Sequence, residues 1–153
     1  MARPRLAGEL SPMPITRGTL SVETQAPIEL VDITERVRVW VRVRGTRDGL
    51  LTVSSPHTTA RITRNEREPR LQDDMVAFLA RLAPAAATYA HNQDTVDGRA
   101  NAHSHLLGLL MPASESIPVE GGELMLGTWQ SLFLVELDGP RERREIHLHL
   151  ISP

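Results

Sequence analysis

The sequence contains no cysteine and no lysine, and all 17 basic residues among its 153 are arginines. The lack of cysteine excludes disulfides, thiolate nucleophiles, iron–sulfur clusters and cysteine-based zinc sites. The lack of lysine excludes Schiff-base chemistry and the lysine of a P-loop. The groups left for catalysis are therefore histidine, carboxylates, hydroxyls and arginine, together with any bound metal ion.

Aromatic residues are also scarce, with two Phe, two Trp and one Tyr, so the core must be built from aliphatic side chains and methionine. The apolar fraction of 41% and the charged fraction of 24% are those of an ordinary globular protein. The length suits one domain. We expect a flexible tail over residues 1–14 and a single domain over residues 15–153.

Long apolar runs and a basic excess are both missing. No run approaches the roughly 20 residues that span a bilayer, and the N-terminus lacks the apolar segment of a signal peptide. The formal net charge of −2 disfavours nucleic acid and anionic membranes as partners, since both select basic surfaces. We expect a cytoplasmic protein that binds neither nucleic acid nor membrane.

Residue patterns predict an α+β domain. Proline at position 69 and apolar residues at helical spacing predict a helix over residues 69–82. Residues 89–101 read as a polar loop, and residues 102–110 as one or two helical turns. The alternation of apolar and polar residues predicts strands over residues 15–25, 50–54, 58–63, 116–119, 123–126, 129–137 and 144–151.

One segment, residues 33–43, is ambiguous. Valines at every second position alternate with arginines, which is a strand pattern. Asp32 or Thr34 could instead cap a helix. The inner face of that helix would consist of Ile33, Val37, Trp40 and Val41. The pattern alone slightly favours the strand.

Histidines are the strongest candidates for metal ligands or catalytic groups in this sequence. His57, His91, His103 and His105 lie in the middle of the chain, close in sequence to several carboxylates. Imidazoles with a carboxylate and water suit zinc, manganese or a similar ion. His103 and His105 would project to opposite sides of a helix, so they could share one ion only in a loop or at a helix start. The alternative is that these are surface histidines of a loop.

Two further groups of polar residues have plain explanations. His147 and His149 alternate with apolar residues and most simply form the polar face of a strand. The arginine-rich stretches at residues 36–47 and 141–144 could hold phosphate, since guanidinium groups match phosphate oxygens. Such stretches are more often solvated faces.

Four ordered blocks of sequence resemble the YjbQ-like family, whose members are often labelled secondary thiamine-phosphate synthases. The resemblance covers roughly residues 15–151. The blocks are Val53 to Ala60 followed by Asn65-Glu66, then Tyr89 to Asn92 with Asn101 to Leu106, then Ile117 to Val119 with Gly122 and Leu126 to Gln130, and lastly Glu136 to Arg141.

The resemblance implies a fold and an assembly. The fold would be α+β, with a mixed, barrel-like β-sheet and two or three helices packed outside. The protein would form a compact homotrimer whose histidine-bearing pocket lies near a subunit interface. Residues 33–44 would form a helix, against the alternating pattern.

The resemblance also implies a site. His91 and His105, joined by His103 or His57 and water, would bind a divalent metal ion, zinc or magnesium. Glu66 or His57 would move a proton, and Arg141 would contact phosphate together with Arg61.

These residues predict a metal-dependent enzyme that acts on a small phosphorylated metabolite, with weak thiamine-phosphate synthase activity as one expectation. The alternative is a non-catalytic trimeric module that binds a metal or a metabolite. A third interpretation is a structural trimer whose histidines serve packing.

Overall fold

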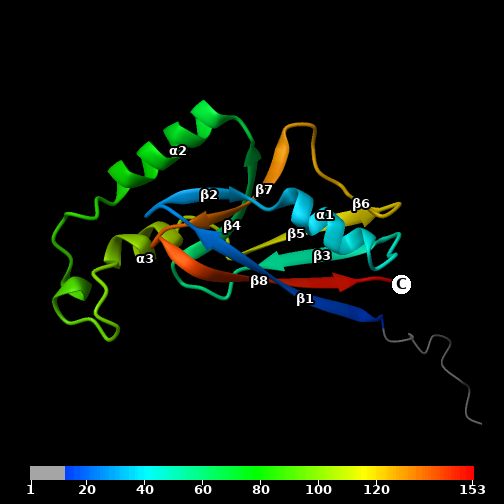
Figure 1. Cartoon of the computed structure of the whole chain (residues 1–153), viewed down its shortest axis with the longest axis horizontal. Coiled ribbons are helices and arrows are strands. Elements are labelled where there is room, and N and C mark those ends of the chain that lie inside the picture. The colour runs from blue at the N-terminus through cyan, green and yellow to red at the C-terminus, as the bar shows by residue number, and fades with distance from the viewer. Residues whose placement is uncertain (1–12) are drawn as a thin grey trace, which may run out of the picture.

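A computed structural model describes residues 13–153, so most of the predicted tail at residues 1–14 lies outside the described residues. The strands form two sheets (Figure 1). The first has the order β1 (Ile15–Thr24), β8 (Arg141–Ile151), β3 (Gly49–Ser54), β5 (Ser114–Glu120) and β6 (Glu123–Leu124). The second has the order β2 (Glu29–Asp32), β7 (Gln130–Glu136) and β4 (Ala60–Glu66).

Helices lie on the outside of these curved sheets (Figure 1). They are α1 (Thr34–Arg42), α2 (Pro69–Leu82), α3 (Ala102–Gly108) and a 3-10 turn, η1 (Ala90–Gln93). The expected α+β class with a curled sheet and outer helices is confirmed. The strand pairings among residues 13–153 are antiparallel, so the sheet is less mixed than expected.

Strand β7 is the centre of the core because both of its faces are buried. Leu132 and Leu134 point into the main core, which lies between the two sheets and α1. Phe133 and Val135 point the other way, into a second core beneath α2 and α3. A strand covered on both sides reads as a continuous apolar run, which is why residues 129–137 gave a clear strand prediction.

The ambiguous segment is a helix, so the strand preferred from its alternation was wrong and the helix implied by the family resemblance is confirmed. Asp32 Oδ1 accepts a hydrogen bond from the amide of Thr34 at 2.8 Å, which satisfies one of the free donors at the start of α1. Ile33, Val37 and Val41 are fully buried at intervals of four residues. Burial of this one helical face outweighs the strand preference of the valines.

Helix α2 has the predicted bounds. The carboxylate of Glu68 accepts hydrogen bonds from the amides of Arg70 and Leu71, and Pro69 occupies the first helical position. The predicted apolar face is only partly covered, however. Leu79 is buried, whereas Phe78 is 54% exposed and Leu82 is 48% exposed. The described chain thus leaves much of this helix face open.

The other strand predictions hold apart from their ends. Strand β4 extends to Glu66, three residues beyond the predicted run, and β8 begins at Arg141 instead of residue 144. The short strand β2 was not predicted. Within residues 13–153, no helix has the length and apolarity needed to cross a membrane.

Candidate functional site

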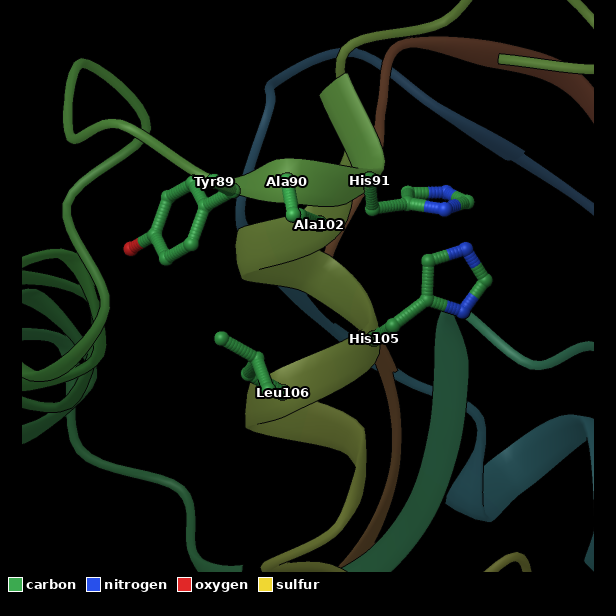
Figure 2. A pocket seen from close by; sticks show the side chains of 6 residues that line it. All are labelled: Tyr89, Ala90, His91, Ala102, His105 and Leu106. Atoms are coloured by element: carbon green, nitrogen blue, oxygen red, sulfur yellow. The ribbon is translucent and has the colours of Figure 1, made fainter. Parts of the chain in front are cut away.

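Two of the predicted metal ligands come together in a pocket. His91 lies on η1 and His105 on α3, and their ring centroids are 5.3 Å apart with an interplanar angle of 82°. The rings lie side by side at one end of the pocket, with Tyr89 and Leu106 at the other (Figure 2). The pocket has a volume of about 470 Å³. Apart from the two imidazoles, its lining is largely apolar.

The position of the pair depends on contacts between short segments. The side chain of Asn92 accepts a hydrogen bond from the amide of Ala102 at 3.0 Å, which ties η1 to the first turn of α3. Because η1 and α3 have only 4 and 7 residues, neither would be stable alone. Their geometry must therefore come from the residues around them.

Asp138, in the turn after β7, holds the loop that leads into α3. Its carboxylate accepts hydrogen bonds from Arg99 at 2.9 and 3.1 Å and from the Asn101 amide group at 2.9 Å. Arg141 donates to the same carboxylate. Burial tends to raise the pKa of Asp138, but these donors outweigh it and the pKa lies below its usual range.

A second carboxylate, Glu136, is fully buried beside Asp138. Arg144 on β8 donates to both of its oxygens, with Nε at 2.6 Å from Oε2. Thr24 on β1 also donates, at 3.0 Å, and the amide of Asp138 donates at 2.8 Å. Burial opposes the charged form, yet Arg144 and the other donors keep the pKa of Glu136 below its ordinary value. This cluster joins the two sheets.

His103 makes different contacts from those of His91 and His105. Its Nε2 is 3.2 Å from the hydroxyl of Ser104, which itself donates to the carbonyl of Leu137. The Ser104 oxygen is therefore the acceptor and the proton lies on Nε2. Nδ1 of His103 is buried and has no partner among residues 13–153. Burial lowers the pKa of His103, so the ring is neutral near pH 7.

The backbone holds one ring nitrogen of His57, which limits the proton transfer that this residue can perform. Its Nε2 accepts the amide of Glu145 at 2.9 Å, so in the neutral ring the proton lies on Nδ1. Burial, and next the charge of Arg144, lower the pKa of His57. In this arrangement His57 can donate a proton through Nδ1, while acting as a base through Nε2 would break the bond to Glu145.

The predicted catalytic residues are not gathered in one place. Glu66 pairs with Gln130 at one end of the β4–β7 ladder, while Ala60 pairs with Glu136 at the other. Because β4 has seven residues, the two ends of the ladder lie about 20 Å apart. Of the predicted phosphate contacts, Arg141 is bonded to Asp138, and Arg61 donates to the carbonyl of Gly108 at 2.8 Å.

The full predicted ligand set is likewise not assembled in one cluster. Over the described part of the chain, residues 13–153, no group of three or more His, Asp or Glu side chains is close enough to hold a metal ion. His91 and His105 are the two of the proposed ligands that meet. His147 and His149 alternate with buried residues on β8 and are half-buried, as their pattern predicted.

Sequence reasoning missed the structural carboxylates. Glu136 and Asp138 belong to a sequence block used for the family resemblance, but only Arg141 of that block was given a role. The available signal was a glutamate that directly follows the apolar run of β7. A charged residue that continues a buried strand needs a buried partner, and Arg144 is the arginine at that end of β8.

We predict that Arg144→Met destabilises the protein by about 3–5 kcal/mol at pH 7, because Glu136 is left buried without its cation. In the native chain the lowered pKa of Glu136 contributes stability above about pH 5, which is lost as the pH falls through the folded pKa. In the variant, burial without Arg144 raises that pKa, so the difference between the two proteins shrinks on acidification. Urea unfolding from pH 4 to pH 8 measures both effects.

The matched control is Arg143→Met, on the same strand, which removes an exposed pair with Glu145. Its cost should stay below about 1 kcal/mol at every pH. Equal destabilisation by both substitutions would contradict the structural role of the buried pair.

The comparisons with known proteins agree with one another. A family model described as UPF0047 protein YjbQ-like matches residues 18–153. The UPF0047 protein of Methanothermobacter thermautotrophicus is 44% identical over 125 residues, which cover 82% of this chain and 85% of the relative. The UPF0047 protein YugU of Bacillus subtilis is 35% identical over 127 residues, covering 82% and 92%.

Solved structures show the same fold. A YbjQ-like protein of unknown function from Sulfolobus solfataricus matches with a TM-score of 0.85 at 35% identity, covering 92% of this chain and 99% of the other. A hypothetical protein from Aeropyrum pernix matches with a TM-score of 0.82 at 40% identity, covering 90% and 99%. The match of nearly whole chains confirms the family resemblance found in the sequence.

Proposed function

This chain belongs to the UPF0047 family of YjbQ-like proteins, and we propose that its histidine pocket binds a divalent metal ion through His91 and His105. The ion would serve chemistry on a small phosphorylated metabolite. The supporting observation is the spacing of the two rings. The apolar remainder of the pocket adds to it, because small-molecule sites combine apolar walls with a few polar groups.

The two imidazoles fit one tetrahedral ion. A Zn–N bond of about 2.0 Å places each ring centroid about 3.2 Å from the ion, so two such centroids lie about 5 Å apart. The centroids of His91 and His105 are 5.3 Å apart. Neutral imidazole suits zinc better than magnesium, which prefers oxygen ligands. We therefore favour zinc over magnesium, with water or ligand atoms completing the coordination.

An ion bound there would polarise a phosphoryl or carbonyl oxygen and lower the pKa of bound water. The chain itself contributes the shape of the site. Tyr89 and Leu106 form walls that exclude water and accept the organic part of a ligand. Asn92, through its hydrogen bond with the amide of Ala102, keeps η1 next to α3 and so keeps the two imidazole rings close together.

Thiamine-phosphate synthesis is the narrower form of this proposal, and it stays a prediction that rests on the family resemblance. That reaction releases pyrophosphate, whose departure needs a metal ion or arginine. Among residues 13–153, no arginine belongs to the wall of the pocket, and Arg141 is engaged by Asp138. Arg141 would have to exchange partners to reach the ligand.

The alternative is non-catalytic binding of a metal or metabolite. One observation favours it: within the described residues 13–153, the lining of the pocket includes no carboxylate that could act as a general acid or base. The two functions differ in one readout. An enzyme releases product from a phosphorylated substrate in the presence of metal. A binding module binds the metal or metabolite to saturation and releases no product.

We predict that the metal-free protein binds zinc at one site per chain and that His91→Ala and His105→Ala each weaken this binding by at least tenfold. Loss of one of two protein ligands removes half of the protein's coordination. Isothermal titration with zinc, supported by elemental mass spectrometry of the untagged protein, measures the affinity and the stoichiometry.

His149→Ala is the matched control, since His149 lies on the outer face of β8 and should leave zinc binding unchanged. His103→Ala separates the two versions of the ligand set, because only a site that includes His103 would lose affinity. Zinc binding that survives both His91→Ala and His105→Ala would show that the site is elsewhere.

We also propose the homotrimer implied by the family resemblance. Its support is the open apolar surface of α2 and the segment after α3, where Leu109 is 79% exposed and Leu110 is 65% exposed. Contiguous apolar patches on a folded chain mark interaction surfaces. A trimer would also give Glu66 a way to act at the histidine pocket, by reaching it from a neighbouring subunit.

We predict a solution mass about three times the 17.0 kDa of one chain. Light scattering coupled to size-exclusion chromatography measures this mass. Leu109→Glu should lower it, because a buried interface charge is costly. A native chain that elutes at the mass of a monomer at micromolar concentration would contradict the trimer.

A further inference from the structure

A second, polar pocket lies where β2 passes into α1. It has a volume of about 430 Å³, and its wall includes Arg36, Arg38 and Arg67 together with Ser131. It is separate from the histidine pocket in the same chain. Strand β7 begins beside this pocket at Gln130 and ends at Glu136, near the loop that leads into α3. Its seven residues place the two ends of the strand about 20 Å apart.

The arginines of this pocket have longer contacts with carboxylates than the six arginines that form close ion pairs elsewhere. Outside the pocket, six of the arginines in residues 13–153 lie within 3.1 Å of a carboxylate oxygen: Arg42, Arg64, Arg99, Arg141, Arg143 and Arg144. In the pocket, Arg67 is 3.3 Å from Asp32 and Arg38 is 3.8 Å from Glu35. Arg36 donates to a backbone carbonyl, that of Ser21, at 2.6 Å. Three guanidinium groups thus meet two carboxylates.

Both of these carboxylates are also shared. Asp32 accepts the amide of Thr34 through Oδ1, in addition to its pair with Arg67. Glu35 divides its charge between Arg38 and Arg42, which lies 3.5 Å from it. The pocket therefore keeps a net positive charge, and the start of α1 adds the positive end of the helix dipole.

Arg38 is the side chain that most clearly needs an acceptor. The Arg38 side chain as a whole is 36% exposed, but its Nε is buried and has no hydrogen-bond partner among residues 13–153. A buried N–H group that belongs to a charged side chain and has no acceptor is unfavourable, and such groups are rare in native proteins. A bound ligand could supply the missing acceptor. The flat guanidinium group matches two oxygens of a phosphate at once.

We propose that this pocket binds the phosphate group of a small metabolite, with Arg38 as its principal contact and Arg67 as a second. Ser131 supplies a neutral hydroxyl donor in the same wall. The volume exceeds what a phosphate group alone fills, so part of the attached organic group also enters the pocket. This site is independent of the metal proposed at His91 and His105.

The test is titration of the full-length protein with inorganic pyrophosphate and, separately, with inorganic phosphate, by calorimetry at low salt. We expect saturation near one ion per chain and binding that weakens as sodium chloride is raised. Arg38→Gln should weaken binding by about tenfold or more, the loss expected for a charge-assisted hydrogen bond. Arg38→Lys should recover only part of it, because lysine keeps the charge without the planar fork.

Arg47→Gln is the matched control, since it makes the same change of charge at an exposed position outside the pocket. It should leave the affinity unchanged. Equal affinity in the native protein and Arg38→Gln, or no binding at millimolar pyrophosphate, would overturn the proposal. So would equal binding of sulfate and chloride, which indicates an unselective basic surface.

Two cross-measurements keep this site distinct from the metal site. Arg38→Gln should bind zinc with native affinity, and His91→Ala should bind pyrophosphate with native affinity. If Arg38→Gln is poorly folded by circular dichroism, Arg67→Gln replaces it, with the same expected loss. Failure of zinc binding alone would refute the metal proposal and leave this one standing.

Discussion

The ion pair between Glu136 and Arg144 is the interaction on which the arrangement of this protein depends. Glu136 lies on the three-stranded sheet and Arg144 on the five-stranded sheet, and the Glu136 side chain is fully buried. Thr24 donates to Glu136, and Arg144 also donates to Thr59 at 3.0 Å. The ion pair therefore connects β1, β7, β8 and the segment before β4. A charge in that position is tolerated because each of its oxygens has a donor.

The same carboxylate sets the turn that carries the functional segments. Oε1 of Glu136 accepts the amides of Leu137 and Asp138, which fixes the backbone where β7 ends. Asp138 then binds Arg99 and Asn101 and so fixes the approach to α3. The histidine pocket has short elements for walls, and these contacts give it a defined geometry. Rigid support from a second layer of residues is what a metal or ligand site needs.

Much of the fold was predictable from the sequence, because burial leaves a periodic pattern. Helix α2 and strand β7 were predicted well, since proline, spacing and a continuous apolar run all agreed there. Helix α1 was not predictable from its pattern, because its valines suit a strand and only tertiary burial of Ile33, Val37 and Val41 decides between the two. The family resemblance supplied that answer.

The site was predictable only in part, for a different reason. The convergence of His91 and His105 followed from sequence blocks of the family. The separation of Glu66 from them followed only from strand register, which spacing along the chain does not reveal. The arginine pocket at α1 was also hidden. Its arginines come from two segments, residues 36–38 and residue 67, and their neutralisation by carboxylates depends on three-dimensional contacts.

Hydrogen exchange detected by mass spectrometry, in the native protein and in Asp138→Asn, tests most directly whether the buried carboxylates hold the histidine pocket. The substitution keeps the size of the side chain but removes the charge that holds Arg99 and Asn101. The account predicts faster exchange in peptides from residues 90–108, with unchanged exchange in β1 and β8. Native protection throughout residues 90–108 would contradict the claim that the buried carboxylates hold the histidine pocket in place.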